Sequence, residues 1–234
     1  MLRVNNLTKR FGKMAALANC SLEVRPGSIT GIIGPNGSGK STLFNCISGL
    51  LRPTAGTIYF VKDDQDHALH RLQPYQIARL GVGRTFQLNR VFKRMSALDN
   101  LLAVRFDRGK AQELLELVGL QRLKDHLAGQ LSIGQQRLLE IARVFMLDPR
   151  MVLLDEPTAG VTPKMIGWLA EHIQSLRQTR QATFVVVEHN LRFILGLSDT
   201  LYVLSAGQVI AHGPPESIRS DPKVIDAYLG GSRA

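Results

Sequence analysis

The sequence predicts an α/β fold with a mostly parallel sheet. Strand-length runs of apolar residues alternate with helical patterns along the chain, as they do in βαβ units. A glycine-rich loop follows the first buried run and precedes a helical pattern. One stretch in the middle of the chain, from about 89 to 130, shows helical periodicity and no strand signal, so we expect a small helical subdomain inserted into the α/β core.

The elements can be placed in chain order. A buried strand is expected at 28–33, followed by a helix from Lys40 to about Leu50 that Pro53 stops. Ser132 is a plausible N-cap for a helix that ends near Leu147, before Asp148-Pro149. The remaining elements are a helical segment at 111–118, strands at 151–154, 183–187, 201–204 and 208–211, a turn at 206–207, and short helices at 215–219 and 222–229.

Length and composition fit one globular domain of 234 residues, with a core formed by about 1–88 and 150–234 and the helical subdomain at about 89–149. Hydrophobic residues make up 44% and charged residues 21%, which excludes disordered, collagen-like and coiled-coil chains. No apolar run is long enough to span a membrane. The two cysteines, Cys20 and Cys46, predict neither a disulfide framework nor a zinc site.

The net charge of +10 favours contact with phosphate, nucleic acid or an anionic membrane surface. Basic residues gather between 84 and 110, and we expect most of them to form a solvated face. We also consider that this stretch faces anionic lipid or a partner surface. Its members are Arg84, Arg90, Lys93, Arg94, Arg105, Arg108 and Lys110.

The glycine-rich loop matches the phosphate-binding pattern GxxxxGK[ST]. Glycines allow successive N–H groups to point into one concavity, and the following helix adds the positive end of its dipole. Lys40 is placed to reach the β and γ phosphates, and the Ser41 hydroxyl to coordinate Mg²⁺. The loop consists of Gly34, Pro35, Asn36, Gly37, Ser38, Gly39, Lys40, Ser41 and Thr42. It therefore predicts a site for a nucleoside triphosphate.

Two acidic residues follow the predicted strand at 151–154. A strand in a parallel sheet delivers side chains at its carboxyl end to the edge where ligands of α/β folds bind. We expect Asp155 to hold Mg²⁺ and Glu156 to act as the base that polarises the attacking water. Together with the glycine loop, they predict hydrolysis of the triphosphate.

A further motif, Leu131-Ser132-Ile133-Gly134-Gln135-Gln136, precedes the helical sequence RLLEIAR. It resembles the signature motif of ATP-binding cassette (ABC) proteins, usually LSGGQ, and the order of motifs along nearly the whole chain is also that of this family. The resemblance implies the ABC ATPase fold, a P-loop core with an N-terminal antiparallel β part and an inserted helical subdomain.

The same resemblance implies further site residues. Phe11 would stack on adenine, Gln87 would be the Q-loop glutamine that approaches the metal and the reacting water, and His189 would lie near the γ phosphate. The start of the signature helix would contact ATP held by a partner subunit, through Ser132, Gly134 and Gln135.

Within the family, the sequence is most similar to ATPase subunits of branched-chain amino acid importers and their relatives for urea and amides. The segments that carry this likeness are 77–87, the signature helix and the tail at 221–230. Ile133 stands where the consensus has its first glycine, and Thr162 where many cassettes carry aspartate.

The resemblance implies an ATP-hydrolysing subunit of a membrane transporter, with ATP and Mg²⁺ as cofactors, on the cytoplasmic face of the cell membrane. A second ABC ATPase subunit, separate permease subunits and a substrate-binding protein are the expected partners, and nucleic acid is not. The alternatives are an ATPase of a lipid or lipopolysaccharide exporter, a non-transport ABC ATPase acting on ribosomes or DNA, and a small-molecule kinase, which would have no use for the signature motif.

Overall fold

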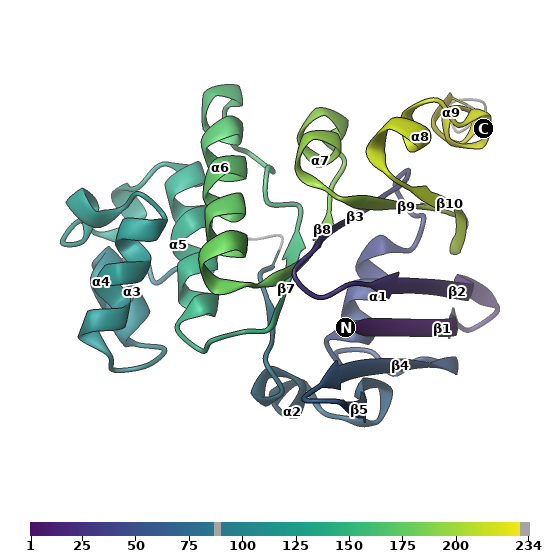
Figure 1. Ribbon diagram of the computed structural model, residues 1–234, viewed down its shortest axis with the longest axis horizontal. Coiled ribbons are helices and arrows are strands. Elements are labelled where there is room, and N and C mark those ends of the chain that lie inside the picture. The colour runs from purple at the N-terminus through teal and green to yellow at the C-terminus, as the bar shows by residue number, and fades with distance from the viewer. Residues whose placement is uncertain (87–89, 230–234) are drawn as a thin grey trace.

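The core of the computed structural model is a six-stranded sheet (Figure 1). Its order is β10-β9-β3-β8-β7-β6, in which neighbours run parallel except for the antiparallel pair of β9 and β10. The strands are β3 (Ile29–Ile33), β6 (Val82–Arg84), β7 (Met151–Asp155), β8 (Thr183–Val187), β9 (Thr200–Ser205) and β10 (Gln208–Gly213). The prediction of a mostly parallel sheet is confirmed. The structure describes residues 1–86 and 90–229.

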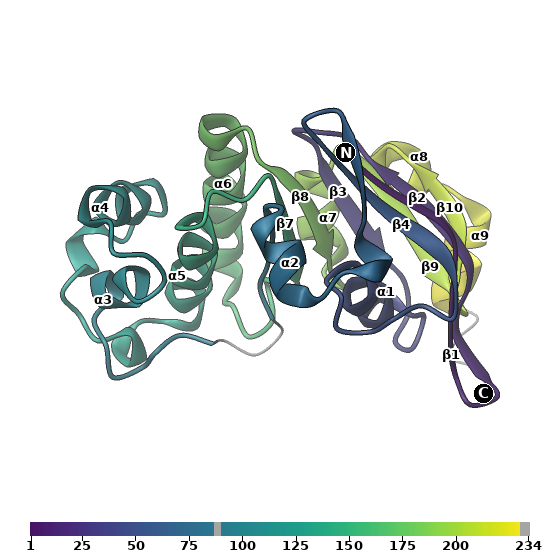
Figure 2. The same ribbon diagram turned by 90° about the horizontal axis from the view of Figure 1, so that it is seen from below.

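A second, antiparallel sheet comes from the N-terminal part of the chain, as the family resemblance implied. Its order is β2-β1-β4-β5, with strands β1 (Leu2–Phe11), β2 (Met14–Val24), β4 (Ala55–Lys62) and β5 (Gln65–Ala68). The two sheets lie side by side (Figure 2), and the Ala18 amide donates a hydrogen bond to the Gly207 carbonyl at 2.9 Å. Helix α1 (Lys40–Ile47) shares one apolar cluster with strands of both sheets.

The central strands are covered on both faces. Val152 and Leu154 of β7 pack in a cluster with helices α5 (Ile133–Phe145), α6 (Pro163–Arg180) and α7 (Leu191–Leu197). Met151 and Leu153 pack in the cluster that contains α1 and the antiparallel sheet. The same alternation holds in β8 and β9. Because both faces are buried, these strands are continuous apolar runs in the sequence, which is why they could be predicted.

Helices α6 (Pro163–Arg180) and α7 (Leu191–Leu197) cover one face of the six-stranded sheet, and α2 (Pro74–Arg79), preceded by the 3₁₀ turn η1 (Leu69–Arg71), leads into β6. Helices α8 (Pro215–Arg219) and α9 (Pro222–Leu229) close the chain at the predicted positions. Helix α1 is shorter than predicted because Gly49, with φ of 75°, follows the C-cap Ser48 and ends it. No helix of the described residues is long and apolar enough to cross a membrane.

The helical segment lies at one end of the molecule, beside α6 (Figure 1). It contains α3 (Ala97–Leu102), α4 (Arg108–Leu117), α5 (Ile133–Phe145) and the 3₁₀ turns η2 (Gln121–Leu123) and η3 (Ala128–Gln130). Within its described residues the only β pairing is an isolated bridge between Ser96 and Leu127. The helical character of this stretch is confirmed, and its boundaries at 89 and 149 stay a prediction.

Candidate active site

The candidate site lies along the carboxyl ends of four neighbouring strands. In the sheet order β3-β8-β7-β6, β3 leads into the glycine loop, β8 into Glu188 and His189, β7 into Asp155 and Glu156, and β6 ends at Arg84. Residues far apart in the sequence therefore meet at one edge of the sheet, which is where α/β folds bind ligands.

The glycine loop has a backbone path that requires glycine. Gly34 and Gly39 have φ of 150° and 105°. A Cβ atom on Gly34 would lie 2.0 Å from the Leu204 carbonyl oxygen, and one on Gly39 would lie 2.5 Å from the Ala16 carbonyl oxygen. Any side chain at these two positions would clash with backbone. The loop therefore runs close to neighbouring backbone, which only glycine allows at these positions. It leads directly into α1, whose first N–H groups have no partner within the helix.

Lys40 places a positive charge inside this loop. Its Nζ donates hydrogen bonds to the carbonyl oxygens of Gly34 (2.8 Å) and Pro35 (2.9 Å). Burial lowers the pKa of Lys40, and the nearby carboxylates of Glu156 and Asp155 act in the opposite direction. The first turn of α1 contains no acidic residue. The loop, the helix terminus and the ammonium group together form a site suited to an anion.

Asp155 ends β7 and is held by a buried ion pair. Its Oδ2 lies 2.9 Å from Nη2 of Arg84, and the two side chains are only 8% and 9% exposed. The expectation of a solvated basic face is therefore wrong for Arg84. It is also wrong for Lys110, whose side chain is 11% exposed and pairs with Asp148, whereas the described side chains of Arg90, Lys93, Arg94, Arg105 and Arg108 are exposed.

Glu156 follows in a left-handed conformation, with φ of 47°. Its amide donates to the Val187 carbonyl at 2.9 Å, which ties the end of β7 to the end of β8 and holds this backbone turn. The Glu156 Oε2 atom lies 3.9 Å from Nδ1 of His189, and the His189 side chain is well exposed. The carboxylate and the imidazole thus face the same space at the sheet edge.

Glu188 was not among the predicted site residues, yet it organises this part of the site. It is fully buried. Its Oε1 accepts from the Thr158 amide (2.8 Å) and hydroxyl (2.6 Å), and its Oε2 accepts from the amides of His189 (2.9 Å) and Asn190 (3.0 Å). One carboxylate therefore joins the loop after β7 to the loop after β8. In the sequence, the signal that could have identified Glu188 is its position directly after a buried strand and next to His189.

The predicted N-cap Ser132 is confirmed at the start of α5. The Ser132 amide donates to Gln135 Oε1 at 2.9 Å, and the Gln135 amide donates to Ser132 Oγ at 3.3 Å, which makes a capping box. Ser132 and Ile133 are exposed, and Gly134 packs against Val161 and Met165. The start of this helix is therefore exposed to solvent at Ser132 and Ile133.

Two further residues, Phe11 and Gln87, were predicted to belong to the site. Phe11 is 46% exposed at the end of β1, with the Lys9 ammonium 5.2 Å from its ring centroid, so its ring is available to a ligand. Gln87 lies outside the described residues. No cluster of three or more His, Cys, Asp or Glu side chains that could hold a metal ion occurs in the described ranges.

Comparison with known proteins agrees with this geometry. The family model described as ABC transporter matches residues 17–159, and that described as Branched-chain amino acid ATP-binding cassette transporter matches residues 208–234. The high-affinity branched-chain amino acid transport ATP-binding protein LivG of Escherichia coli K12 is 40% identical over 253 aligned positions, which cover 98% of each chain. Its counterpart BraF of Pseudomonas aeruginosa is 38% identical, also over 98% of each chain.

Solved structures are similar over almost the same span. The ATP-binding cassette MJ1267 in its ADP conformation has a TM-score of 0.89 and 37% identity, with 98% of each chain covered. The dimeric cassette MJ0796 bound to ADP and Pi has a TM-score of 0.78 and 29% identity, with 92% of this chain and 99% of that chain covered. The chain therefore belongs to the ABC transporter family, as an ATP-binding protein of its branched-chain amino acid (LivG/BraF) group.

Proposed function

We propose that this chain hydrolyses ATP to drive the import of branched-chain amino acids through separate permease subunits. The observation that carries the proposal is the meeting of the glycine loop, the pair Asp155-Glu156 and His189 at one sheet edge, in a chain whose relatives are named for branched-chain amino acid transport.

The triphosphate is bound by the loop Gly34–Thr42, with Lys40 reaching the β and γ phosphates. For this, the Lys40 ammonium exchanges its carbonyl partners in the loop for phosphate oxygens, which is favourable because a charged acceptor forms the stronger hydrogen bond. Phe11 stacks on the adenine ring.

Mg²⁺ neutralises charge on the phosphates when it is bound. The chain offers oxygen donors of the kind this ion prefers, the Ser41 hydroxyl and the Asp155 carboxylate, and we assign Gln87 to the same role. A site with few protein ligands fits a metal that arrives with the phosphates, because Mg²⁺ usually keeps several waters and binds through one or two carboxylates.

Glu156 polarises the attacking water, and His189 contacts the γ phosphate. The positive φ of Glu156 and the hydrogen bond from its amide to the Val187 carbonyl hold the backbone in place, and the carboxylate lies 3.9 Å from His189 Nδ1. Glu188 supports this arrangement by fixing the backbone of His189.

Two such subunits enclose two ATP molecules, and each ATP also contacts the signature helix of the other subunit through Ser132, Gly134 and Gln135. The exposed, capped start of α5 supports this assignment, because its N–H groups and helix dipole suit a phosphate from outside the chain. The dimeric MJ0796 cassette is a precedent for such an assembly among the similar structures.

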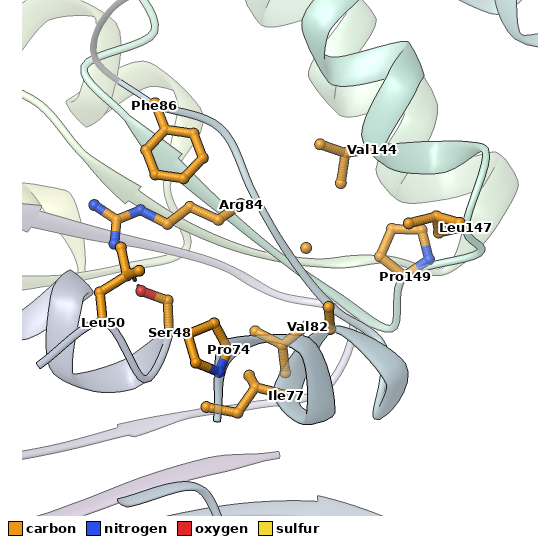
Figure 3. Close-up of a pocket in the computed structure, with 12 residues that line it drawn as sticks. Ser48, Leu50, Pro74, Ile77, Val82, Arg84, Phe86, Val144, Leu147 and Pro149 are labelled. Carbon is orange, nitrogen blue, oxygen red and sulfur yellow. Dashed lines mark hydrogen bonds between the residues drawn. The ribbon is translucent and has the colours of Figure 1, made fainter. Parts of the chain in front are cut away.

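The permease subunit docks in a groove between the core and the helical segment (Figure 3). This groove has a volume of about 250 Å³ and is lined mainly by apolar residues, among them Ile77, Val82, Phe86, Val144 and Leu147. It lies beside the segment that leads to Gln87, so docking and nucleotide chemistry are adjacent. The assembly sits at the cytoplasmic face of the membrane with a substrate-binding protein as a further partner, and no nucleic acid takes part.

The test compares Glu156→Gln with Glu171→Gln, an exposed glutamate on α6 that serves as the matched control. Glu156→Gln should lower the steady-state ATPase rate by about 10²- to 10⁴-fold, the usual contribution of a general base. Uptake of labelled leucine by cells that depend on this chain should fall with it, and Glu171→Gln should leave both unchanged. A normal ATPase rate in Glu156→Gln would refute the base assignment, and leucine uptake that is independent of active protein would refute the substrate class.

A further inference from the structure

Two residues of the run Arg84-Thr85-Phe86, which begins at the end of β6, form hydrogen bonds with Asp155. Arg84 Nη2 donates to Asp155 Oδ2 at 2.9 Å. Thr85 Oγ1 accepts from the Asp155 amide at 3.4 Å, and the Thr85 amide donates to the Leu153 carbonyl at 3.0 Å. Side chain and backbone of Asp155 are therefore both in contact with the residues just before Gln87.

The Arg84 guanidinium is also held by α1, the helix that follows the glycine loop. Its Nη1 donates to Asn45 Oδ1 at 2.8 Å and to Ser48 Oγ at 2.7 Å, in the last turn and at the C-cap of α1. Figure 3 shows the side chain extending past Phe86 toward Ser48. A cation also suits the C-terminal end of a helix, where the dipole is negative. Arg84 thus bridges the helix that begins at the glycine loop and the acidic end of β7.

The other end of the run is fixed by the signature helix. Arg137 Nη1 donates to the Phe86 carbonyl at 2.7 Å, and the Phe86 amide donates to Glu140 Oε1 at 3.4 Å. Arg137 and Glu140 pair at 3.1 Å, with side chains only 4% and 6% exposed. The centroid of the Phe86 ring lies 5.2 Å from the Arg84 guanidinium carbon. Contacts on both sides leave the Arg84 side chain little freedom to move.

We propose that Arg84 is a positioning residue for ATP hydrolysis, which fixes the direction in which the Asp155 carboxylate faces the metal–nucleotide complex. This inference rests on the proposed function, in which Asp155 holds Mg²⁺. The planar guanidinium fork can contact Asp155, Asn45 and Ser48 at once, whereas the single ammonium of lysine cannot reproduce that geometry. Partners that orient a metal ligand in this way typically contribute about 10- to 100-fold to metal affinity or activity.

The experiment uses the purified full chain with Arg84→Lys and Arg84→Gln, and Arg79→Gln as the control, since Arg79 is exposed on α2. Binding of a fluorescent ATP analogue is measured in EDTA and in Mg²⁺, together with kcat and KM. Arg84→Lys should bind the analogue normally in EDTA and lose most of the gain in affinity that Mg²⁺ brings. In Mg²⁺ it should therefore raise KM for ATP, and it should lower kcat by about 10- to 100-fold.

A third variant is included because Arg84→Gln leaves Asp155 without its cation, which can prevent folding. Asn45→Ala removes one support of Arg84 and keeps the ion pair, so it should change the Mg²⁺ dependence and kcat in the same direction by a smaller factor. Folded Arg84→Lys and Asn45→Ala proteins with wild-type Mg²⁺ dependence and kcat would overturn the inference. A wild-type chain without Mg²⁺-dependent hydrolysis would instead overturn the proposed function, so the two failures are distinguishable.

Discussion

At the scale of single residues, Glu188 has a structural role at the site that the sequence analysis did not predict. A fully buried carboxylate is costly unless it is saturated with hydrogen bonds, and Glu188 accepts four, from Thr158, His189 and Asn190. These bonds hold the backbone of His189 in place beside Glu156. Glu188 therefore acts on the site through its neighbours.

We expect Glu188→Gln to destabilise the protein and to slow hydrolysis. The glutamine amide group would turn N–H donors toward backbone N–H donors, so at least one donor would lose its partner, at a cost of about 1–3 kcal/mol. Urea unfolding and kcat are measured together, with the exposed Glu216→Gln as the control. A free energy of unfolding within about 0.5 kcal/mol of the wild-type value would contradict the assigned role, since surface substitutions stay in that range.

The residues that the sequence could predict are those whose chemistry is local. Lys40 and Glu156 follow directly from a glycine loop and from a buried strand that ends in acids. Glu188 also follows a buried strand, but neither its burial nor that of Arg84 could be predicted, because burial of a charge depends on partners elsewhere in the chain. The partner of Arg84 is 71 residues away, and that of Glu188 is 30 residues away.

At the scale of elements, two serine N-caps allow the structural role of a cap to be distinguished from a functional one. Ser132 caps α5, and Ser96 caps α3 in the same way, accepting from the Asp99 amide at 3.0 Å. Only Ser132 belongs to the signature motif. Ser96 can therefore serve as the control for a substitution of Ser132.

Ser132→Ala and Ser96→Ala should each lower stability by about 1 kcal/mol, the usual cost of losing an N-cap. Only Ser132→Ala should also weaken ATP-dependent association of two chains, because only this cap lies where the partner's ATP is proposed to bind. Thermal unfolding and analytical ultracentrifugation measure the two effects. Equal association of both variants would argue against the proposed role of the signature helix.

Element prediction succeeded where periodicity is long or burial is complete. The strands β7 and β8 bury both faces and were placed almost to the residue. Strand β6 has only three residues, Val82–Arg84, too few for a period to be visible. Helix α6 was not predicted, although Pro163 at its first turn and the spacing of Leu169, Ile173 and Leu176 are helical signals.

At the scale of the whole molecule, the interior between the two sheets buries both cysteines and favours their protonated form. Cys20 and Cys46 are buried in the apolar cluster that joins α1 to both sheets. Burial raises the pKa of Cys20 to about 12 and that of Cys46 to about 11. Both thiols therefore stay protonated at neutral pH.

Native protein should react with a thiol reagent such as DTNB at pH 8 only very slowly, and both thiols should react once guanidinium unfolds the chain. Unfolded thiols ionise near their ordinary pKa of 9.0, below the folded values. Deprotonation therefore favours the unfolded chain, and stability should fall as the pH rises above about 9. Rapid stoichiometric labelling of the native protein would contradict this account of the core.

In the proposed assembly, the core carries the glycine loop and the helical segment carries the signature helix, so each ATP site is completed by a second chain. This assembly would form by a population shift, if ATP binds the closed pair better than the separate subunits, as proposed. The most direct measurement is the mass of the Glu156→Gln variant in solution, by size-exclusion chromatography with light scattering. With ATP and Mg²⁺ the account predicts the mass of two chains, and without nucleotide that of one. A single-chain mass at saturating ATP, in a variant that binds ATP and does not hydrolyse it, would contradict the central claim.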